Sequence, residues 1–198
     1  MISTDSRGFS LIETLMVVAL IGVLAAIAVP MSGNTLKYLK LSGDARDLAN
    51  VTAVAKMRAA ALFTQSRVYI DVTGRTFYVQ TYDKATSTWI TEGGANPLSS
   101  TVTFSYGPLL APPPDTQTTI GQAPACLNNA SPAVAIANTA CIIFNSRGIP
   151  IDTTGSPTGL AAIYVTDGTA VYGITVAATG FIRTWQANYQ STATWTQQ

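Results

Sequence analysis

An almost unbroken apolar run near the N-terminus constrains this chain more than any other feature. It extends from Phe9 to Pro30 and contains one ionisable residue, Glu13. In a helix, with a rise of about 1.5 Å per residue, this run spans about 33 Å, which matches the hydrocarbon core of a bilayer. It is longer than the apolar core of about 7–15 residues in a cleaved secretory signal. We therefore expect a membrane-spanning helix over residues 9–31.

The remaining composition allows one compact domain and excludes several classes of function. Of the 198 residues, 47% are hydrophobic and only 11% are charged, against about 25% charged in an ordinary soluble domain. The net charge of +1 gives no bulk attraction to nucleic acid or anionic lipid. The chain has no histidine and two cysteines, which excludes a closed zinc site of these ligands and removes the commonest general base. We predict no enzymatic activity, no cofactor and no metal site.

The carboxylate of Glu13 stands out inside the apolar run. A charged group there is costly in lipid unless it has a partner, so an acidic residue within a membrane segment is a candidate for function. The α-amino group released by cleavage between Gly8 and Phe9 would be such a partner. The alternative is that Glu13 lies at the membrane interface and extends toward water.

The residues that surround Glu13 carry a resemblance. Residues 7–13, Arg-Gly-Phe-Ser-Leu-Ile-Glu, followed by the apolar run, resemble the class III signal of type IV prepilins and type II secretion pseudopilins. The resemblance implies that residues 1–8 are a leader that a prepilin peptidase removes after Gly8, and that Phe9 is then N-methylated. It also implies that Glu13 docks the subunit into a growing filament. Arg7, before the span, agrees with the positive-inside rule and keeps the leader in the cytoplasm.

Beyond the apolar run, the pattern changes to that of an amphipathic helix. Apolar residues recur at spacings of three and four, which is typical of one buried helix face; they are Leu41, Ala45, Leu48, Val51 or Thr52, Ala55, Ala59 and Leu62. We predict that residues 32–66 continue the membrane helix, giving one helix of about 55–58 residues.

From residue 67 the apolar period is two, which indicates strands. The expected strands are 67–72, 76–82, 88–91, 101–106, 141–144, 162–165, 171–176 and 181–185, and the first two form a hairpin around Gly74 and Arg75. The proline-rich residues 107–140 are predicted to be a surface loop, and the polar tail 191–198 is expected to fray. The predicted fold class is α+β and pilin-like, with a long N-terminal helix, half transmembrane and half amphipathic, packed on a β-rich antiparallel head of residues 67–198.

The order of the last strands resembles the GspH/FimT family of minor pilins and pseudopilins. In that family a Phe-x-x-x-Gly turn precedes a meander that ends in a Gly-Arg-x-Arg-like strand, and the corresponding segments here are 144–148 and 180–183. The family's link to DNA uptake depends on the arginines of this strand. Arg183 is retained, but Phe181 occupies the first arginine position. Because one arginine alone binds phosphate weakly, DNA contact by Arg183 is not favoured.

The two cysteines flank the second half of the proline-rich loop. If the head lies outside the cytoplasm, we expect Cys126 and Cys141 to form a disulfide. Closing a loop of about 15 residues would stabilise the fold by about 3 kcal/mol. The alternative is a pair of buried free thiols.

These features predict a structural subunit, a minor pilin or pseudopilin, of a type IV pilus or type II secretion filament. The expected partners are other pilin or pseudopilin subunits, the prepilin peptidase and the inner-membrane assembly platform. The expected location is a single pass through the bacterial inner membrane, with the head in the periplasm or outside, and then the filament. A FimT-like DNA-binding minor pilin and a major pilin are the alternatives.

Overall fold

The computed structural model describes residues 10–192 and 194–198, without the side chains of residues 27–34. The chain divides into two units, Met1–Tyr38 and Leu39–Gln198. The helix α1, Leu11–Ala61, belongs to both units and is one α-helix of 51 residues. The predicted continuation of the helix beyond Pro30 is therefore confirmed.

In the first unit, the large apolar side chains of α1 that the structure describes are exposed. From Leu11 to Leu24, the large apolar residues have between 50% and 78% of their surface accessible. No part of the helix that the structure describes is apolar enough over a sufficient length to cross a membrane.

In the second unit, α1 buries the predicted face and ends earlier than predicted. Six of the predicted residues are 0% exposed, namely Leu41, Ala45, Leu48, Thr52, Ala55 and Ala59. The helix ends at Ala61 rather than at residue 66, and Leu62 is 50% exposed. Phe63 takes a left-handed conformation with φ 49°, and the N–H of Thr64 donates to the carbonyl of Ala59 at 3.2 Å. This turn satisfies the last carbonyls and directs the chain into the first strand.

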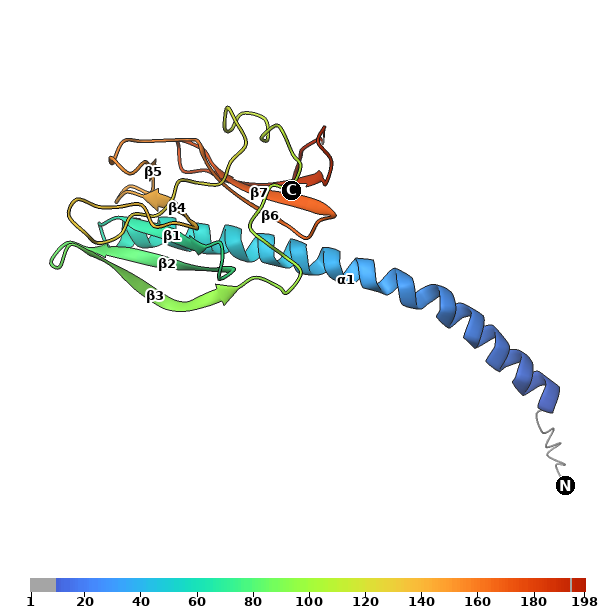
Figure 1. Ribbon diagram of the computed structural model, residues 1–198. Coiled ribbons are helices and arrows are strands. Elements are labelled where there is room, and N and C mark those ends of the chain that lie inside the picture. Colours follow the sequence, from blue (N-terminus) through green and yellow to red (C-terminus); the bar gives the residue numbers. More distant parts are fainter. Residues whose placement is uncertain (1–9, 193) are drawn as a thin grey trace, which may run out of the picture. The chain divides into compact units, whose positions relative to one another are not determined.

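In the residues that the structure describes, nine strands form two antiparallel sheets. Figure 1 labels β1 to β7 of them. The first sheet has the order β3-β2-β1-β4-β5, with β1 Ser66–Asp71, β2 Thr76–Asp83, β3 Thr88–Pro97, β4 Thr139–Phe144 and β5 Pro150–Ile151. The second sheet has the order β6-β7-β8-β9, with β6 Ala161–Thr166, β7 Ala170–Val176, β8 Ile182–Asn188 and β9 Thr196–Gln197. The predicted hairpin is confirmed, since Asp71 pairs with Thr76 across the turn between β1 and β2.

Two expectations for the strands were wrong. Residues 101–106 form a single bridge, between Thr103 and Thr166, and no strand. Val102 and Phe104 of this segment pack in the hydrophobic core. The tail does not fray over its whole length: β9 pairs with β8. Trp195 holds the tail in place, with its ring centroid 5.8 Å from that of Tyr164 and its indole N–H donating to the carbonyl of Ala111.

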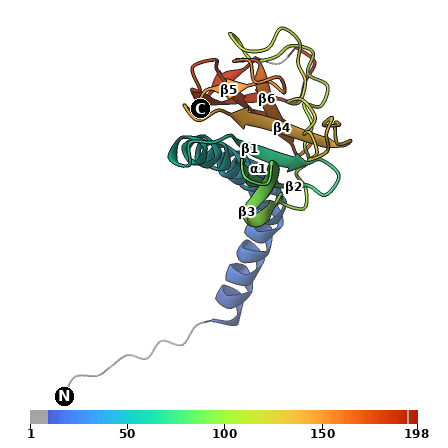
Figure 2. The same ribbon diagram turned by 90° about the vertical axis from the view of Figure 1, so that its left-hand side faces the viewer.

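The helix and both sheets share one hydrophobic core, in which the Leu39–Ala61 part of α1 packs beside the strands (Figure 2). Alternate residues of β6 and β7 face this core, including Ile163, Val165 and Ile174. The opposite face of β6 is also buried, because Tyr164 packs with Leu109 and Val171 in a second cluster. Burial on both faces explains why β6 is apolar throughout its length.

The proline-rich loop is more than a surface connection. Leu109, Ala123 and Cys126 are each at most 5% exposed. The side chain of Gln122 pairs with the edge of β6: its Oε1 accepts the Tyr164 N–H at 2.9 Å and its Nε2 donates to the Tyr164 carbonyl at 2.8 Å. The loop thereby covers an edge that would otherwise expose unpaired backbone groups.

Candidate functional sites

The start of α1 holds one of the predicted sites. Gly8 and Phe9 lie outside the described residues. Glu13 is exposed in the first turn of the helix, and its N–H donates to the carbonyl of Ser10 at 3.0 Å. A carboxylate is favoured at this end of a helix because the unpaired N–H groups carry partial positive charge. Its neighbours Leu11 and Ile12 are 78% and 73% exposed, so Glu13 is a single charge on an apolar surface.

The second predicted site is the disulfide, which the structure contains. Cys126 and Cys141 are bonded, and they are 0% and 5% exposed. They pack with Ile143 and Ile151 in a third cluster on one face of the first sheet. Backbone hydrogen bonds support the bridge, with the Cys141 N–H donating to the carbonyl of Pro124 at 2.8 Å. The predicted pairing is therefore confirmed, and it attaches the loop to β4.

The third predicted site, Arg183, is the single basic residue of its strand. It lies on β8, and its guanidinium carbon is 5.6 Å from the ring centroid of Phe181. Phe181 is 58% exposed. The residue that replaces the first arginine of the family pattern thus packs with the arginine that is retained.

The structure adds a junction beside Arg183 that sequence analysis missed. The Nζ of Lys56 donates to the carbonyl of Gly180 at 2.9 Å, and its Cε is 3.1 Å from the position of a Cβ added at Gly148. A Cβ on Gly180 would collide with the carbonyl oxygen of Gly148. The Phe-x-x-x-Gly turn and the turn before β8 therefore meet on the helix. Lys56 gave no signal in the sequence, because it belongs to the polar positions of the helix pattern.

Gly180→Ala is expected to destabilise the head by about 2 kcal/mol, from the left-handed backbone and the collision together. Gly180 has φ 78°, while Gly168 has φ 84° and open space around its Cβ position. Gly168→Ala is thus a matched control that has the backbone cost alone, about 1 kcal/mol. Urea unfolding measures both variants. Equal losses would show that the two turns are not in tight contact.

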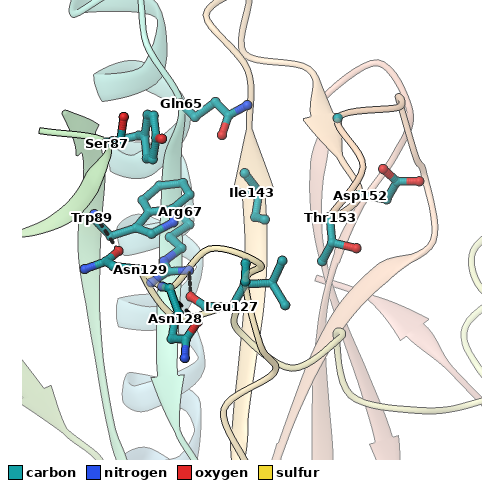
Figure 3. Close-up of a pocket in the computed structure, with 14 residues that line it drawn as sticks. Gln65, Arg67, Ser87, Trp89, Leu127, Asn128, Asn129, Ile143, Asp152 and Thr153 are labelled. Carbon is teal, nitrogen blue, oxygen red and sulfur yellow. Dashed lines mark hydrogen bonds between the residues drawn. The ribbon is translucent and has the colours of Figure 1, made fainter. Parts of the chain in front are cut away.

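A cavity of about 210 Å³ lies in the head between β1, β3, the proline-rich loop and the segment after β5 (Figure 3). Arg67 lies on its wall and is 2% exposed. Its Nε donates to Oε1 of Gln80 at 2.8 Å, and its Nη1 donates to the carbonyl of Leu127 at 2.8 Å. The guanidinium carbon is 4.1 Å from the ring centroid of Trp89, which is a cation–π distance. Arg67 therefore links three segments that are far apart in the sequence.

Burial lowers the pKa of Arg67 to about 10, and the nearby Tyr69 and Tyr78 act in the opposite direction. The side chain remains charged at neutral pH. From the sequence, Arg67 is predicted only as the first residue of a strand. The alternation of residues 67–71 could have indicated its position. In a strand, Arg67 lies on the same face as Tyr69, and Val68 and Ile70 lie on the opposite face.

Comparison with known proteins identifies the N-terminal segment. Residues 4–29 match the family model described as the prokaryotic N-terminal methylation motif. No curated protein sequence matches the chain significantly.

Two solved structures of one protein resemble the fold, both of the minor pseudopilin EpsH from the type 2 secretion system of Vibrio cholerae. The first is 10% identical, has a TM-score of 0.38, and its alignment covers 80% of this chain and 96% of that one. The second is 11% identical, has a TM-score of 0.45, and covers 75% and 94%. The family model is the more specific finding, and it shows that this chain carries the prokaryotic N-terminal methylation motif over residues 4–29.

Proposed function

We propose that this protein is a minor pilin or pseudopilin, a structural subunit of a type IV pilus or type II secretion filament. The methylation motif at residues 4–29 is the observation that carries the proposal. The continuous helix α1 and the β-rich head that packs on its second half support it. The role of the chain is structural, and its partners are other subunits of the same kind.

In this proposal, the precursor is held in the inner membrane by the apolar part of α1, with its head outside the cytoplasm. A prepilin peptidase removes residues 1–8, and the new N-terminus at Phe9 is methylated. The assembly platform then transfers the subunit into the filament. Two observations support this sequence of events: the large apolar residues from Leu11 to Leu24 are exposed, and the head contains a disulfide, which is typical of proteins outside the cytoplasm.

Gly8→Val is expected to block processing, because the scissile backbone must approach the peptidase closely and glycine has no side chain. In cells that contain a prepilin peptidase, mass spectrometry of the wild-type protein is expected to find a chain that begins at Phe9 and carries one added methyl group. The Gly8→Val chain is expected to keep residues 1–8. Ser6→Ala, in the same leader, is the matched control and is expected to be processed normally. A wild-type chain that keeps Met1–Gly8 would contradict the proposal.

DNA binding by the head is the lesser alternative. It would depend on the surface near Arg183, where the basic side chain is paired with the exposed Phe181 rather than with a second arginine. Electrostatic affinity for phosphate increases with each cation that contacts the backbone, so this arrangement favours a structural role over DNA uptake.

A further inference from the structure

The buried cation Arg67 lacks the counter-ion that such a group usually has. A buried charge is normally paired with an opposite charge, because desolvation is costly. Within the part of the chain that the structure describes, Arg67 is bonded only to neutral groups, the amide oxygen of Gln80 and the carbonyl of Leu127. Tyr69 and Tyr78, which act on the pKa of Arg67, are themselves uncharged at neutral pH and supply no counter-ion.

The guanidinium also has an N–H₂ group, that of Nη2, without a hydrogen-bond acceptor among the described residues. Its Nε and Nη1 are occupied. Among the described residues, Asp167 Oδ2 is the only fully buried side-chain nitrogen or oxygen that has no hydrogen-bond partner. Because Nη2 also has no partner but is not fully buried, part of its surface is accessible. Since Arg67 lines the cavity, Nη2 is accessible from it.

Two asparagines of the loop add donors to the same wall. The Oδ1 of Asn128 accepts the N–H groups of Ala130 and Val134, at 3.1 and 2.9 Å. The Oδ1 of Asn129 accepts the N–H of Trp89 at 2.9 Å (Figure 3). These bonds fix the orientation of both amides, because only the oxygen can accept. Among the described residues, neither amide N–H₂ group has an acceptor, and both asparagines line the cavity.

Asp152 lies across the cavity from Arg67 in Figure 3, with Ile143 and Thr153 drawn between them. Its Oδ1 is occupied by three hydrogen bonds from Thr154 and Ser156 in its own turn, at 2.7 to 2.9 Å. Asp152 therefore uses its Oδ1 to stabilise the turn after β5, and among the described residues it forms no ion pair with Arg67.

We propose that this cavity binds a carboxylate group, with the Nη2 of Arg67 as the central donor and the amides of Asn128 and Asn129 beside it. Planar guanidinium and carboxylate groups are geometrically matched. The carboxylate comes either from a free organic acid or from an acidic side chain of a partner protein. This site is separate from the N-terminal helix, so its test is independent of filament assembly.

The test uses ¹⁵N-labelled full-length protein in a non-ionic detergent, with the Arg67 Nε–H and Trp89 indole N–H signals as readouts. Sodium acetate is the free carboxylate, and sodium chloride at equal ionic strength is the control for salt. Acetate is expected to shift both signals in a saturable way, and chloride is not. An acetate response no larger than that of chloride would overturn the proposal.

A second pair of probes distinguishes the sources of the carboxylate. The capped peptide acetyl-Gly-Asp-Gly-amide carries one side-chain carboxylate, and acetyl-Gly-Asn-Gly-amide is its neutral counterpart. If the acidic peptide binds about tenfold more tightly than acetate and the neutral peptide does not bind, a partner protein is the source. If acetate and the acidic peptide bind equally, the site recognises the free acid.

Asn129→Asp tests the site without removing Arg67, whose bond to Leu127 makes its own replacement a folding test as well. The aspartate retains the acceptor for the Trp89 N–H and supplies an internal carboxylate. We expect acetate affinity to fall about tenfold or more and the thermal midpoint to rise. Asn138→Asp adds the same charge to the same loop outside the cavity lining and is expected to leave acetate binding unchanged. Wild-type acetate binding in Asn129→Asp would contradict the proposed site.

Discussion

Glu13→Ala is expected to reduce incorporation of the subunit into filaments about tenfold while leaving cleavage of its leader intact. Glu13 is the acidic residue in the first turn of α1, and the side chains around it are apolar and exposed. In lipid or in a filament core, its carboxylate needs a cationic partner. We propose that the partner is the α-amino group of Phe9. Loss of a pairing worth about 1.4 kcal/mol reduces incorporation about tenfold.

The measurement compares tagged Glu13→Ala and tagged wild-type subunits in cells that also express untagged wild type. Filaments are sheared from the cells, and the tag is quantified in the filament fraction and in the membrane fraction. Thr14→Ala is the matched control, because Thr14 is exposed in the same turn and its hydroxyl donates to the nearby carbonyl of Leu11 at 2.9 Å. Glu13→Gln separates charge from size and is expected to behave like Glu13→Ala. If the Glu13→Ala subunit is incorporated as well as wild type, Glu13 has no role in docking.

Replacing both cysteines by serine is expected to lower the free energy of unfolding by about 3 kcal/mol. The bridge between Cys126 and Cys141 closes a loop with a sequence separation of 15 residues, and its removal gives that loop more freedom in the unfolded chain. For a domain of this size, the loss corresponds to a fall in Tm of about 6–12 °C. Thermal unfolding followed by circular dichroism measures it.

The effect of the double variant should be local as well as global. All six residues of β4 pair with β1, from Thr139 opposite Asp71 to Phe144 opposite Ser66, so this ladder is expected to persist. Faster hydrogen exchange is expected in the loop segment 124–138. A reducing agent should reproduce the effect in the wild-type protein and change nothing in the variant. A wild-type protein whose Tm is unaffected by reduction would show that the bridge contributes no stability.

Local patterns predicted most of the secondary structure because they depend on neighbouring residues. The spacing of three and four fixed the buried face of α1 from Leu41 to Ala59, and the period of two located most of the strands. The same patterns failed at Leu62 and at residues 101–106. At Leu62, a left-handed turn at Phe63 ended the helix. At Val102 and Phe104, burial against the core outweighed strand pairing.

The cavity around Arg67 could not be predicted from the sequence, because its parts are distant along the chain. Arg67 is on β1, Trp89 is on β3 and Asn129 is in the loop, and each has an ordinary role when considered alone. Their juxtaposition depends on the pairing of β1, β2 and β3 and on the disulfide that attaches the loop to β4. The junction of Lys56, Gly148 and Gly180 was missed for the same reason.

The sequence by itself determined the continuous helix, the largely antiparallel head and the N-terminal methylation motif, since each is encoded by adjacent residues or by a short period. It also indicated the pairing of the only two cysteines. The tertiary structure decided how the loop covers both sheets, where α1 ends, and that a buried arginine faces a cavity without a carboxylate partner in the described residues. These depend on contacts between distant segments, whose free energy is gained only when the whole head packs.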